Sequence, residues 1–394
     1  MLMGIVGKPN CGKSTFFKAS TLAEVEIANY PFATIKPNRG IGYAKVKCVD
    51  TYFNVQCNPR EGFCLNHYRF IPVQLIDVAG LVPGAHLGKG MGNEFLNDLN
   101  QADMLIHVVD VSGSTNEKGE PCQPLSYDPV NDILFLEEEL NRWFLSILAK
   151  NWEKCAKAAQ LEKQSTVKSI AKQMSGLRVT EEMVKEALKE DHPTNLTQWK
   201  QEDMLRLCSA LRRMSKPIII AANKVDVPGA GENLERIKRK FPNETIIPTS
   251  AEAERVLKEA AKKHLIRYIP GDAIVTPRGH LNPEQEKAVA FIKASVLAVY
   301  SSTGIQQVID AAVFTTLRYI PIYPGDSKLK DKDGNILPDC FLLKRGSTAE
   351  DFAFRIHSDI GKNFIRAVNI KTKQVVGKSY ILQEDDVIEI LTKR

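Results

Sequence analysis

The stretch Gly7-Lys8-Pro9-Asn10-Cys11-Gly12-Lys13-Ser14-Thr15 follows an apolar run from Met1 to Val6. It is a full match to G-x-x-x-x-G-K-[ST], the pattern of a phosphate-binding loop between a strand and a helix. Glycines let such a loop aim successive backbone N–H groups at phosphate oxygens, and the helix N-terminus adds a partial positive charge. Lys13 is expected to reach the β- and γ-phosphates, and the Ser14 hydroxyl to ligate Mg²⁺. The nucleotide contacts predicted for this loop are Gly7, Pro9, Asn10, Cys11, Gly12, Lys13, Ser14 and Thr15.

Two later segments carry residues suited to the γ-phosphate and its metal ion. Residues 29–40 contain prolines and a glycine, which predicts a loop, and Thr34 in it is placed to ligate Mg²⁺ and to offer its N–H to the γ-phosphate. A loop threonine alone is more often a local turn former. A strand predicted at 70–76 ends in the D-x-x-G arrangement of Asp77 and Gly80. Asp77 is expected to hold Mg²⁺ through water, and the Gly80 N–H to bind the γ-phosphate.

A third segment predicts the base that the site accepts. Asn223-Lys224-Val225-Asp226 follows a predicted strand at 217–222 and forms an N-K-x-D pattern. The Asp226 carboxylate can accept two hydrogen bonds from the N1–H and the exocyclic amine of guanine, a donor pair that adenine lacks. Asn223 is expected to contact the base edge and hold the loop, and the Lys224 stem to cover one ring face. Ser250 and Ala251 follow another short strand, and their backbone N–H groups are predicted to meet the guanine O6.

The order of these motifs at strand ends predicts an α/β fold with the nucleotide at the carboxyl edge of a parallel sheet, as in a P-loop GTPase. A buried strand is predicted at 104–111, and helices at 254–268 and 283–300. The segment between the strands at 104–111 and 217–222 has helical periodicity and balanced charge, which favours a structural or partner-facing subdomain. The predicted units are a GTP-binding domain (1–112 and 217–278), a helical insert (113–216), a helical connector (279–318) and an α+β domain (319–394).

In this last domain, β-like runs are predicted at 340–343, 364–370 and 387–391, around a helix at 348–358.

Composition and charge are those of an ordinary globular protein. The 394 residues are 43% hydrophobic and 25% charged, and the formal net charge of +6 is a weak indication of a polyanionic partner. Neither a basic, cleavable leader nor an apolar run of about 20 residues is found, so the chain is expected to be cytoplasmic and not bound to a membrane.

The eight cysteines include no C-x-x-C pair and do not suggest a disulfide framework. Cys48, Cys57, Cys64 and His67 are four potential soft ligands for Zn²⁺ within a short segment. Their spacing fits no familiar zinc knuckle, so the sequence favours a hairpin excursion with part-buried thiols over a zinc site. Metal analysis decides between the two.

The motifs also resemble those of the Obg-related GTPases, and within them the YchF-like branch. The resemblance lies in the phosphate loop, in residues 29–34 with Pro37 and Asn38, in residues 77–85 and in residues 88–96. The C-terminal domain resembles a TGS domain of ubiquitin-like β-grasp fold. This resemblance implies a link to ribosomes and translation, with the TGS-like domain as the RNA or ribosome contact. YchF proteins carry glutamate in place of the final aspartate of N-K-x-D and favour ATP, whereas this chain keeps Asp226, so GTP is expected.

The group that positions the attacking water is harder to predict. Leu81 directly follows D-x-x-G, where small GTPases commonly carry glutamine, and leucine cannot hydrogen-bond water. Slow basal hydrolysis is therefore expected, with another group completing the site. His86 is one candidate, with a solvated loop histidine as the alternative. Asn10 stands where related GTPases bind a K⁺ ion that replaces an arginine finger, so it is a candidate K⁺ ligand.

Three functions remain open from the sequence. The first is a GTPase switch that requires Mg²⁺ and reports its nucleotide state to a ribosome or RNA. The second is a ribosome- or RNA-binding module that uses GTP mainly as a structural ligand, which Leu81 favours. The third is an ATPase of the YchF type, against which Asp226 argues.

Overall fold

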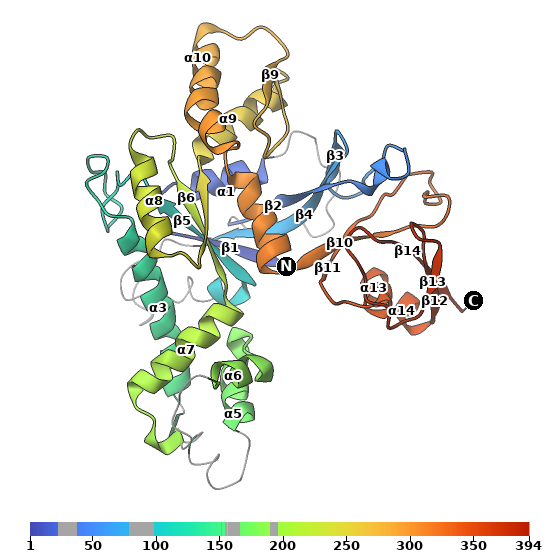
Figure 1. Ribbon diagram of the computed structural model, residues 1–394, viewed down its shortest axis with the longest axis horizontal. Coiled ribbons are helices and arrows are strands. Elements are labelled where there is room, and N and C mark those ends of the chain that lie inside the picture. Colours follow the sequence, from blue (N-terminus) through green and yellow to red (C-terminus); the bar gives the residue numbers. More distant parts are fainter. Residues whose placement is uncertain are drawn as a thin grey trace.

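The computed structural model of the chain describes residues 1–22, 38–78, 98–150, 152–153, 156, 166–189 and 196–393 (Figure 1). At its centre lies a seven-stranded sheet of order β2-β4-β1-β5-β6-β7, with β3 paired to one end of β4. The strands from β4 to β7 in this order run parallel, and β2 is antiparallel to β4. This arrangement confirms the predicted α/β class. The strands are β1 (Leu2–Val6), β2 (Arg39–Lys47), β3 (Phe63–Leu65), β4 (Tyr68–Asp77), β5 (Met104–Asp110), β6 (Ile218–Asn223) and β7 (Thr245–Thr249).

Helices cover both faces of this sheet, because successive strand residues point to opposite sides. In β1, Met3 and Ile5 join one buried cluster, and Leu2 and Val6 join another. The first cluster is closed by α1 (Lys13–Thr21) and α12 (Ile305–Asp310). On the other face pack α3 (Val130–Ala149) and α8 (Ala230–Lys240). Because helices cover both faces of the sheet, a ligand can reach it at the ends of the strands.

A helical region lies between β5 and β6 in the sequence and projects from one end of the molecule (Figure 1). Its core is continuous with that of the sheet, since α3 residues reach both. The Trp152 and Trp199 rings pack within it with centroids 5.2 Å apart. Its described helices after α3 are α5 (Thr166–Gln173), η3 (Ser175–Leu177), α6 (Glu181–Ala187), η4 (Leu196–Gln198) and α7 (Gln201–Ser215).

The helix predicted at 254–268 is shorter than expected. Helix α9 (Ala251–Lys262) ends before His264, which has a left-handed φ of 57°, and the chain then forms β8 (Ile266–Tyr268). β8 pairs antiparallel with β9 (Val275–Pro277), and this pairing overrides the local helical preference. The following helical segments are α10 (Pro283–Ile292), η5 (Lys293–Leu297), α11 (Ala298–Tyr300), α12 and η6 (Ala311–Thr316).

Within the described residues, no single helix is long and apolar enough to cross a membrane. The bent pair Pro283–Tyr300 and Ile305–Thr316 meets the length and composition limits only when taken together. Apolar residues of both members pack in buried clusters of the fold, as core helices do.

The C-terminal domain is a mixed five-stranded sheet of order β11-β10-β14-β12-β13, covered by α13 (Ala349–Ile356) and α14 (Ser358–Lys362). Phe352 of α13 is fully buried against the sheet. β10 was not predicted, because its two prolines obscure the strand pattern. The strands are β10 (Tyr319–Pro324), β11 (Phe341–Lys344), β12 (Phe364–Asn369), β13 (Gln374–Val376) and β14 (Val387–Thr392).

A buried arginine joins this domain to the central sheet. Arg69 of β4 is 1% exposed, and its guanidinium donates to the carbonyl oxygens of Leu337 (2.9 Å) and Pro338 (2.8 Å). Two backbone bonds lie beside it, from Asn58 N–H to Ile336 O and from Arg60 N–H to Pro338 O. Arg69 therefore satisfies acceptors that the domain contact removes from water.

Replacing Arg69 with methionine is expected to destabilise this contact. The apolar stem remains, but two buried carbonyls lose their donors, which should lower the free energy of unfolding by about 3 kcal/mol. Denaturant unfolding measures this loss, and limited proteolysis should release the C-terminal domain sooner. Arg60→Met is the control, because the Arg60 side chain is 56% exposed and should matter little. Equal stability of both variants would contradict the role assigned to Arg69.

Candidate functional site

The predicted phosphate loop connects β1 to α1 at the carboxyl edge of the sheet. Helix α1 begins at Lys13, and its first bond runs from Phe16 N–H to Gly12 O at 2.8 Å. Gly12 has a left-handed φ of 96°, and a Cβ at this position would collide with the Asn223 side chain. Glycine is thus required here both by conformation and by close approach to the Asn223 side chain.

Lys13 and Ser14 lie opposite Asp77, which ends β4. Lys13 Nζ is 3.4 Å from Asp77 Oδ1, and Ser14 Oγ is 3.4 Å from Asp77 Oδ2. Asp77 Oδ1 is buried, and apart from the Lys13 ion pair it has no hydrogen-bond partner among the described residues. A hydroxyl and a carboxylate with a spare oxygen are the ligand types that Mg²⁺ prefers. The donor set therefore fits a magnesium ion held between α1 and the end of β4.

Asn223 ties the phosphate loop to the turn after β7. Its side chain is buried, with Nδ2 donating to Cys11 O at 3.0 Å and Oδ1 accepting from Ala251 N–H at 3.0 Å. Ser250 caps α9 by accepting from Ala253 N–H, and its own N–H donates to Thr303 O. The predicted residues Asn223, Ser250 and Ala251 thus meet at one place. The N–H groups predicted to reach guanine already have protein partners in this structure.

Lys224 is fixed by a buried carboxylate that the sequence reasoning missed. Lys224 has a left-handed φ of 67°, and its Nζ lies 2.8 Å from Oδ2 of Asp110, the last residue of β5. Asp110 is fully buried and also accepts from Ser112, Ser114 and Thr115. Burial alone would raise the pKa of Asp110, but bonds from Lys224 and Ser112 leave that pKa below its usual value. Asp110 therefore stays ionised and holds the Lys224 stem.

Asp226 is a second acidic residue of the site, besides Asp77, that remains available to a ligand. It lies half-buried in the turn after β6, and its carboxylate has no partner among the residues that the structure describes. The neighbouring Asn223 and Lys224 are both held by other groups. Asp226 thus offers a hydrogen-bond acceptor in a turn where the side chains of Asn223 and Lys224 are already bonded.

Residues 112–127 pack directly on the phosphate loop. Lys8 Nζ donates to Thr115 O at 2.8 Å and pairs with Asp132 at 2.9 Å, and Asn10 Nδ2 donates to Gly119 O at 2.9 Å. Burial raises the pKa of Asp132, although Lys8 opposes this shift. A Cβ on Gly119, where φ is 80°, would lie 2.5 Å from Pro9 O, so the packing requires glycine. The beginning of the insert therefore buttresses the loop.

The phosphate loop was identified from the sequence, but its contacts with residues 112–127 and the role of Asp110 were not. Asp110 ends a buried strand, and a strand-end aspartate is a signal that could have identified it. The Asn10–Gly119 bond joins residues 109 positions apart, and nothing in either local pattern predicts it.

The predicted residues Thr34, Gly80, Leu81 and His86 lie outside the described residues, so their expected roles stay predictions. Lys13, Ser14, Asp77 and the Asn223–Asp226 turn all lie at one edge of the sheet.

Three family models match different parts of the chain. The model "50S ribosome-binding GTPase" matches residues 2–142, and "Obg-like GTPase YGR210-like, G4 motif-containing domain" matches residues 221–326. The TGS domain matches residues 326–392. The second match includes Asn223 and Asp226, and the third covers most of the C-terminal sheet.

Known proteins match over nearly the whole length. An uncharacterized GTP-binding protein of Methanocaldococcus jannaschii is 47% identical over 99% of both chains. The ribosome-binding ATPase YchF of Bacillus subtilis is 29% identical over 98% of this chain and 97% of that protein. The crystal structure of a GTP-binding protein from Pyrococcus horikoshii superposes with a TM-score of 0.78 at 39% identity, covering 100% of both chains.

The motif order, the fold and these matches agree on one assignment. The chain belongs to the Obg-related GTP-binding proteins, in their YchF-like branch, and carries a C-terminal TGS domain.

Proposed function

We propose that this protein binds GTP together with Mg²⁺, hydrolyses it slowly to GDP, and acts as a nucleotide-dependent switch on the ribosome. The observation that carries the proposal is the Asn223 side chain, which bonds both Cys11 of the phosphate loop and Ala251 of the base turn. A bound nucleotide would lie along this bridge, with its phosphates at the loop and its base at Asp226.

Base selection rests on Asp226. Its carboxylate has no competing partner among the described residues, so it can accept from N1–H and the amine of guanine. An adenine base has no such donor pair and would leave the carboxylate unpaired on binding. Six of the similar proteins carry "ATPase" in their names, whereas the relatives at 47% and 37% identity are named as GTP-binding. Asp226 supports GTP for this chain.

Nucleotide titrations test this selection. Wild-type protein should bind GTP and GDP more tightly than ATP. In Asp226→Glu the extra methylene displaces the carboxylate, so GTP affinity should fall about 10- to 100-fold, as expected for lost bonds to a charged group. Asp333→Glu, on an exposed turn of the C-terminal domain, is the control and should leave affinity unchanged. Equal binding of GTP and ATP by the wild type would refute the assignment.

The phosphate end carries the groups for hydrolysis. Ser14 and Asp77 would hold Mg²⁺, and Lys13 is placed to contact the β- and γ-phosphates. When bound, Mg²⁺ supplies charge neutralisation for the leaving phosphate. Thr34 and Gly80 are proposed to contact the metal ion and the γ-phosphate. Because Leu81 cannot position water, hydrolysis without a partner should be slow.

We propose that a potassium ion takes the place of an arginine finger at the phosphates. His86 is a second candidate, for activating the attacking water. Asn10 Nδ2 is used by Gly119 O, and among the described residues no group donates to Asn10 Oδ1. The amide oxygen is therefore available to a monovalent cation beside the phosphates.

Hydrolysis in matched KCl and NaCl tests the potassium proposal. The rate should be higher in KCl, because K⁺ fits the site better and adds positive charge in the transition state. Asn10→Gly keeps the left-handed φ of 58° and should reduce the difference between the salts. Identical rates in the two salts would remove K⁺ from the mechanism.

Communication with the C-terminal domain is proposed to run through the β2–β4 hairpin. β2 begins at Arg39, just after the segment of Thr34, and β4 ends at Asp77. The opposite end of the hairpin contacts the C-terminal domain through Arg69. Relatives are named as ribosome-binding, which supports a ribosomal partner.

Single-turnover hydrolysis with and without ribosomes distinguishes a switch from a module that only holds GTP. A partner that completes the site should raise the rate about 10-fold or more. The Lys13→Ala protein, mixed with the same ribosomes, corrects for contaminating activity. No acceleration, together with nucleotide-independent ribosome binding, would favour the module.

A further inference from the structure

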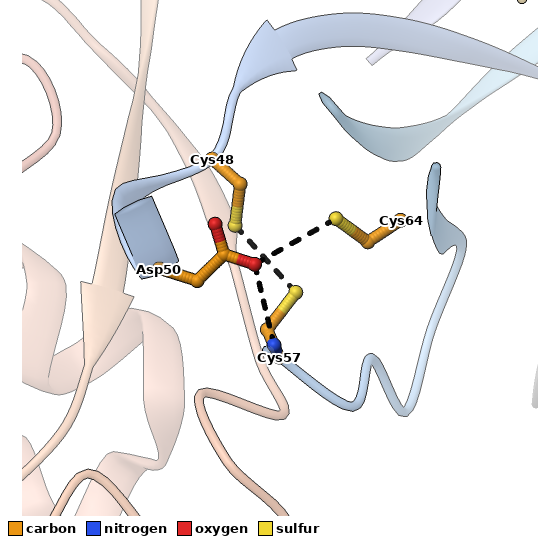
Figure 2. Close-up of side chains that lie close together, drawn as sticks. All are labelled: Cys48, Asp50, Cys57 and Cys64. Carbon is orange, nitrogen blue, oxygen red and sulfur yellow. Dashed lines mark hydrogen bonds between the residues drawn. The ribbon is translucent and has the colours of Figure 1, made fainter. Parts of the chain in front are cut away.

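Three thiols and one carboxylate converge at the end of the β2–β4 hairpin that lies away from the phosphate loop. Cys48 directly follows β2, Asp50 belongs to the short helix η1 (Val49–Thr51), and Cys57 lies in the loop before β3. Cys64 belongs to β3 itself. Figure 2 shows the three sulfur atoms and the Asp50 carboxylate pointing toward a common centre. One ligand atom from each residue lies within 4.8 Å of all the others.

The spacing of these atoms suits a tetrahedral metal ion. Zinc–sulfur bonds of about 2.3 Å place neighbouring ligand atoms of a tetrahedron about 3.8 Å apart. The Cys48 and Cys57 sulfurs are 3.6 Å apart, and Cys64 Sγ lies 3.9 Å from Asp50 Oδ2. Small side-chain adjustments are therefore enough to coordinate an ion, without moving the backbone.

Burial and charge also point to a cation. Asp50 is fully buried and Cys48 is 1% exposed, and a carboxylate removed from water needs compensating positive charge. Cys57 N–H donates to Asp50 Oδ2 at 3.2 Å, and His67 Nδ1 lies 3.0 Å from Asp50 Oδ1. The buried Arg69 guanidinium is within electrostatic reach of Cys48 and Cys57. A divalent cation together with Arg69 would offset three of the four negative charges that three thiolates and one carboxylate carry.

We propose that Cys48, Asp50, Cys57 and Cys64 bind one zinc ion. The set differs from the four residues that the sequence singled out, because Asp50 takes the place of His67. His67 is instead a positioning residue that hydrogen-bonds the free oxygen of the metal-bound carboxylate, the usual arrangement around a zinc ligand. The sequence favoured part-buried thiols without metal, and the convergence of four ligand atoms overrides that expectation.

The site would fix the segment from Cys48 to Cys64 where it meets the C-terminal domain. Cys48 and Cys57 share a buried cluster with Tyr323, Leu337 and Val387 of that domain. Zinc would hold the hairpin excursion in the shape that this surface requires, since so short and irregular a segment has little core of its own. The ion thus serves the domain contact and not nucleotide chemistry.

A disulfide is the competing use of the same thiols. A Cys48–Cys57 disulfide needs sulfurs about 2.05 Å apart and would leave Cys64 and Asp50 outside the bond. Zinc uses all four groups. The two are distinguished by thiol counting, because a disulfide removes two alkylatable cysteines until reduction, whereas zinc protects thiols until chelation.

Metal analysis of the full-length protein, purified without chelators in reducing buffer, tests the proposal. One zinc per chain is expected. After removal of zinc by a zinc-selective chelator in excess Mg²⁺, titration with Co²⁺ should give thiolate charge-transfer and tetrahedral d–d bands at one equivalent. Zinc below a tenth of an equivalent with no such bands, or a Cys48–Cys57 disulfide in freshly prepared protein, would overturn the site.

Variants locate the ligands. Cys57→Ala should lose zinc, whereas Cys208→Ala, which truncates an equally buried thiol in α7, should keep one zinc per chain. His67→Ala should bind zinc about 10- to 100-fold more weakly while its cobalt spectrum keeps the three-thiolate intensity. His67→Gln, which can still donate to Asp50, should restore part of the affinity. Full zinc retention by soluble Cys57→Ala would contradict the ligand set, and if that variant is insoluble, the wild-type cobalt titration decides.

Discussion

The amide of Asn223 holds the nucleotide site together, because it bonds two segments that are distant in the sequence. Its nitrogen donates to Cys11 in the phosphate loop, and its oxygen accepts from Ala251 after β7. The amide is 3% exposed, and breaking either bond would leave a buried polar group unpaired, at a cost of about 1–3 kcal/mol. The distance from the phosphate loop to the base turn is therefore fixed by the protein itself. Such preorganisation strengthens binding, since less order must be imposed by the ligand.

The helical insert and the β2–β4 hairpin make different contacts around this bridge. The beginning of the helical insert supports the phosphate loop through Lys8 and Asn10. The β2–β4 hairpin extends from Asp77, the proposed metal ligand, to the C-terminal domain, where Arg69 and the cysteine cluster lie. A displacement at Asp77 would thus act on the same two strands that contact the TGS domain. These strands physically connect the phosphate-loop edge of the sheet with the C-terminal domain, and their use as a switch is part of our proposal.

Features that depend on neighbouring residues could be predicted from the sequence, whereas contacts between residues far apart in the sequence could not. The phosphate loop and most strands were predicted well, since a strand, a glycine turn and a helix start are local patterns. β10 was missed because Pro321 and Pro324 weaken a strand pattern, yet Pro321 pairs with Leu342 in the observed sheet. Asp50 was missed as a ligand because only the folded excursion brings it to the thiols. Asp110 was missed although it ends a buried strand, whereas the contact of Gly119 with the phosphate loop arises from tertiary packing and leaves no local signal.

In our proposal Asp226, positioned by the Asn223 bridge, recognises the donor edge of guanine. Titration of wild-type and Asp226→Asn proteins with GTP and xanthosine triphosphate tests it most directly. Xanthine has a carbonyl where guanine has its amine, and an asparagine amide can donate to that carbonyl. The account predicts that wild type prefers GTP and that Asp226→Asn prefers xanthosine triphosphate. An unchanged preference in the variant would show that Asp226 does not contact the base and would contradict the account.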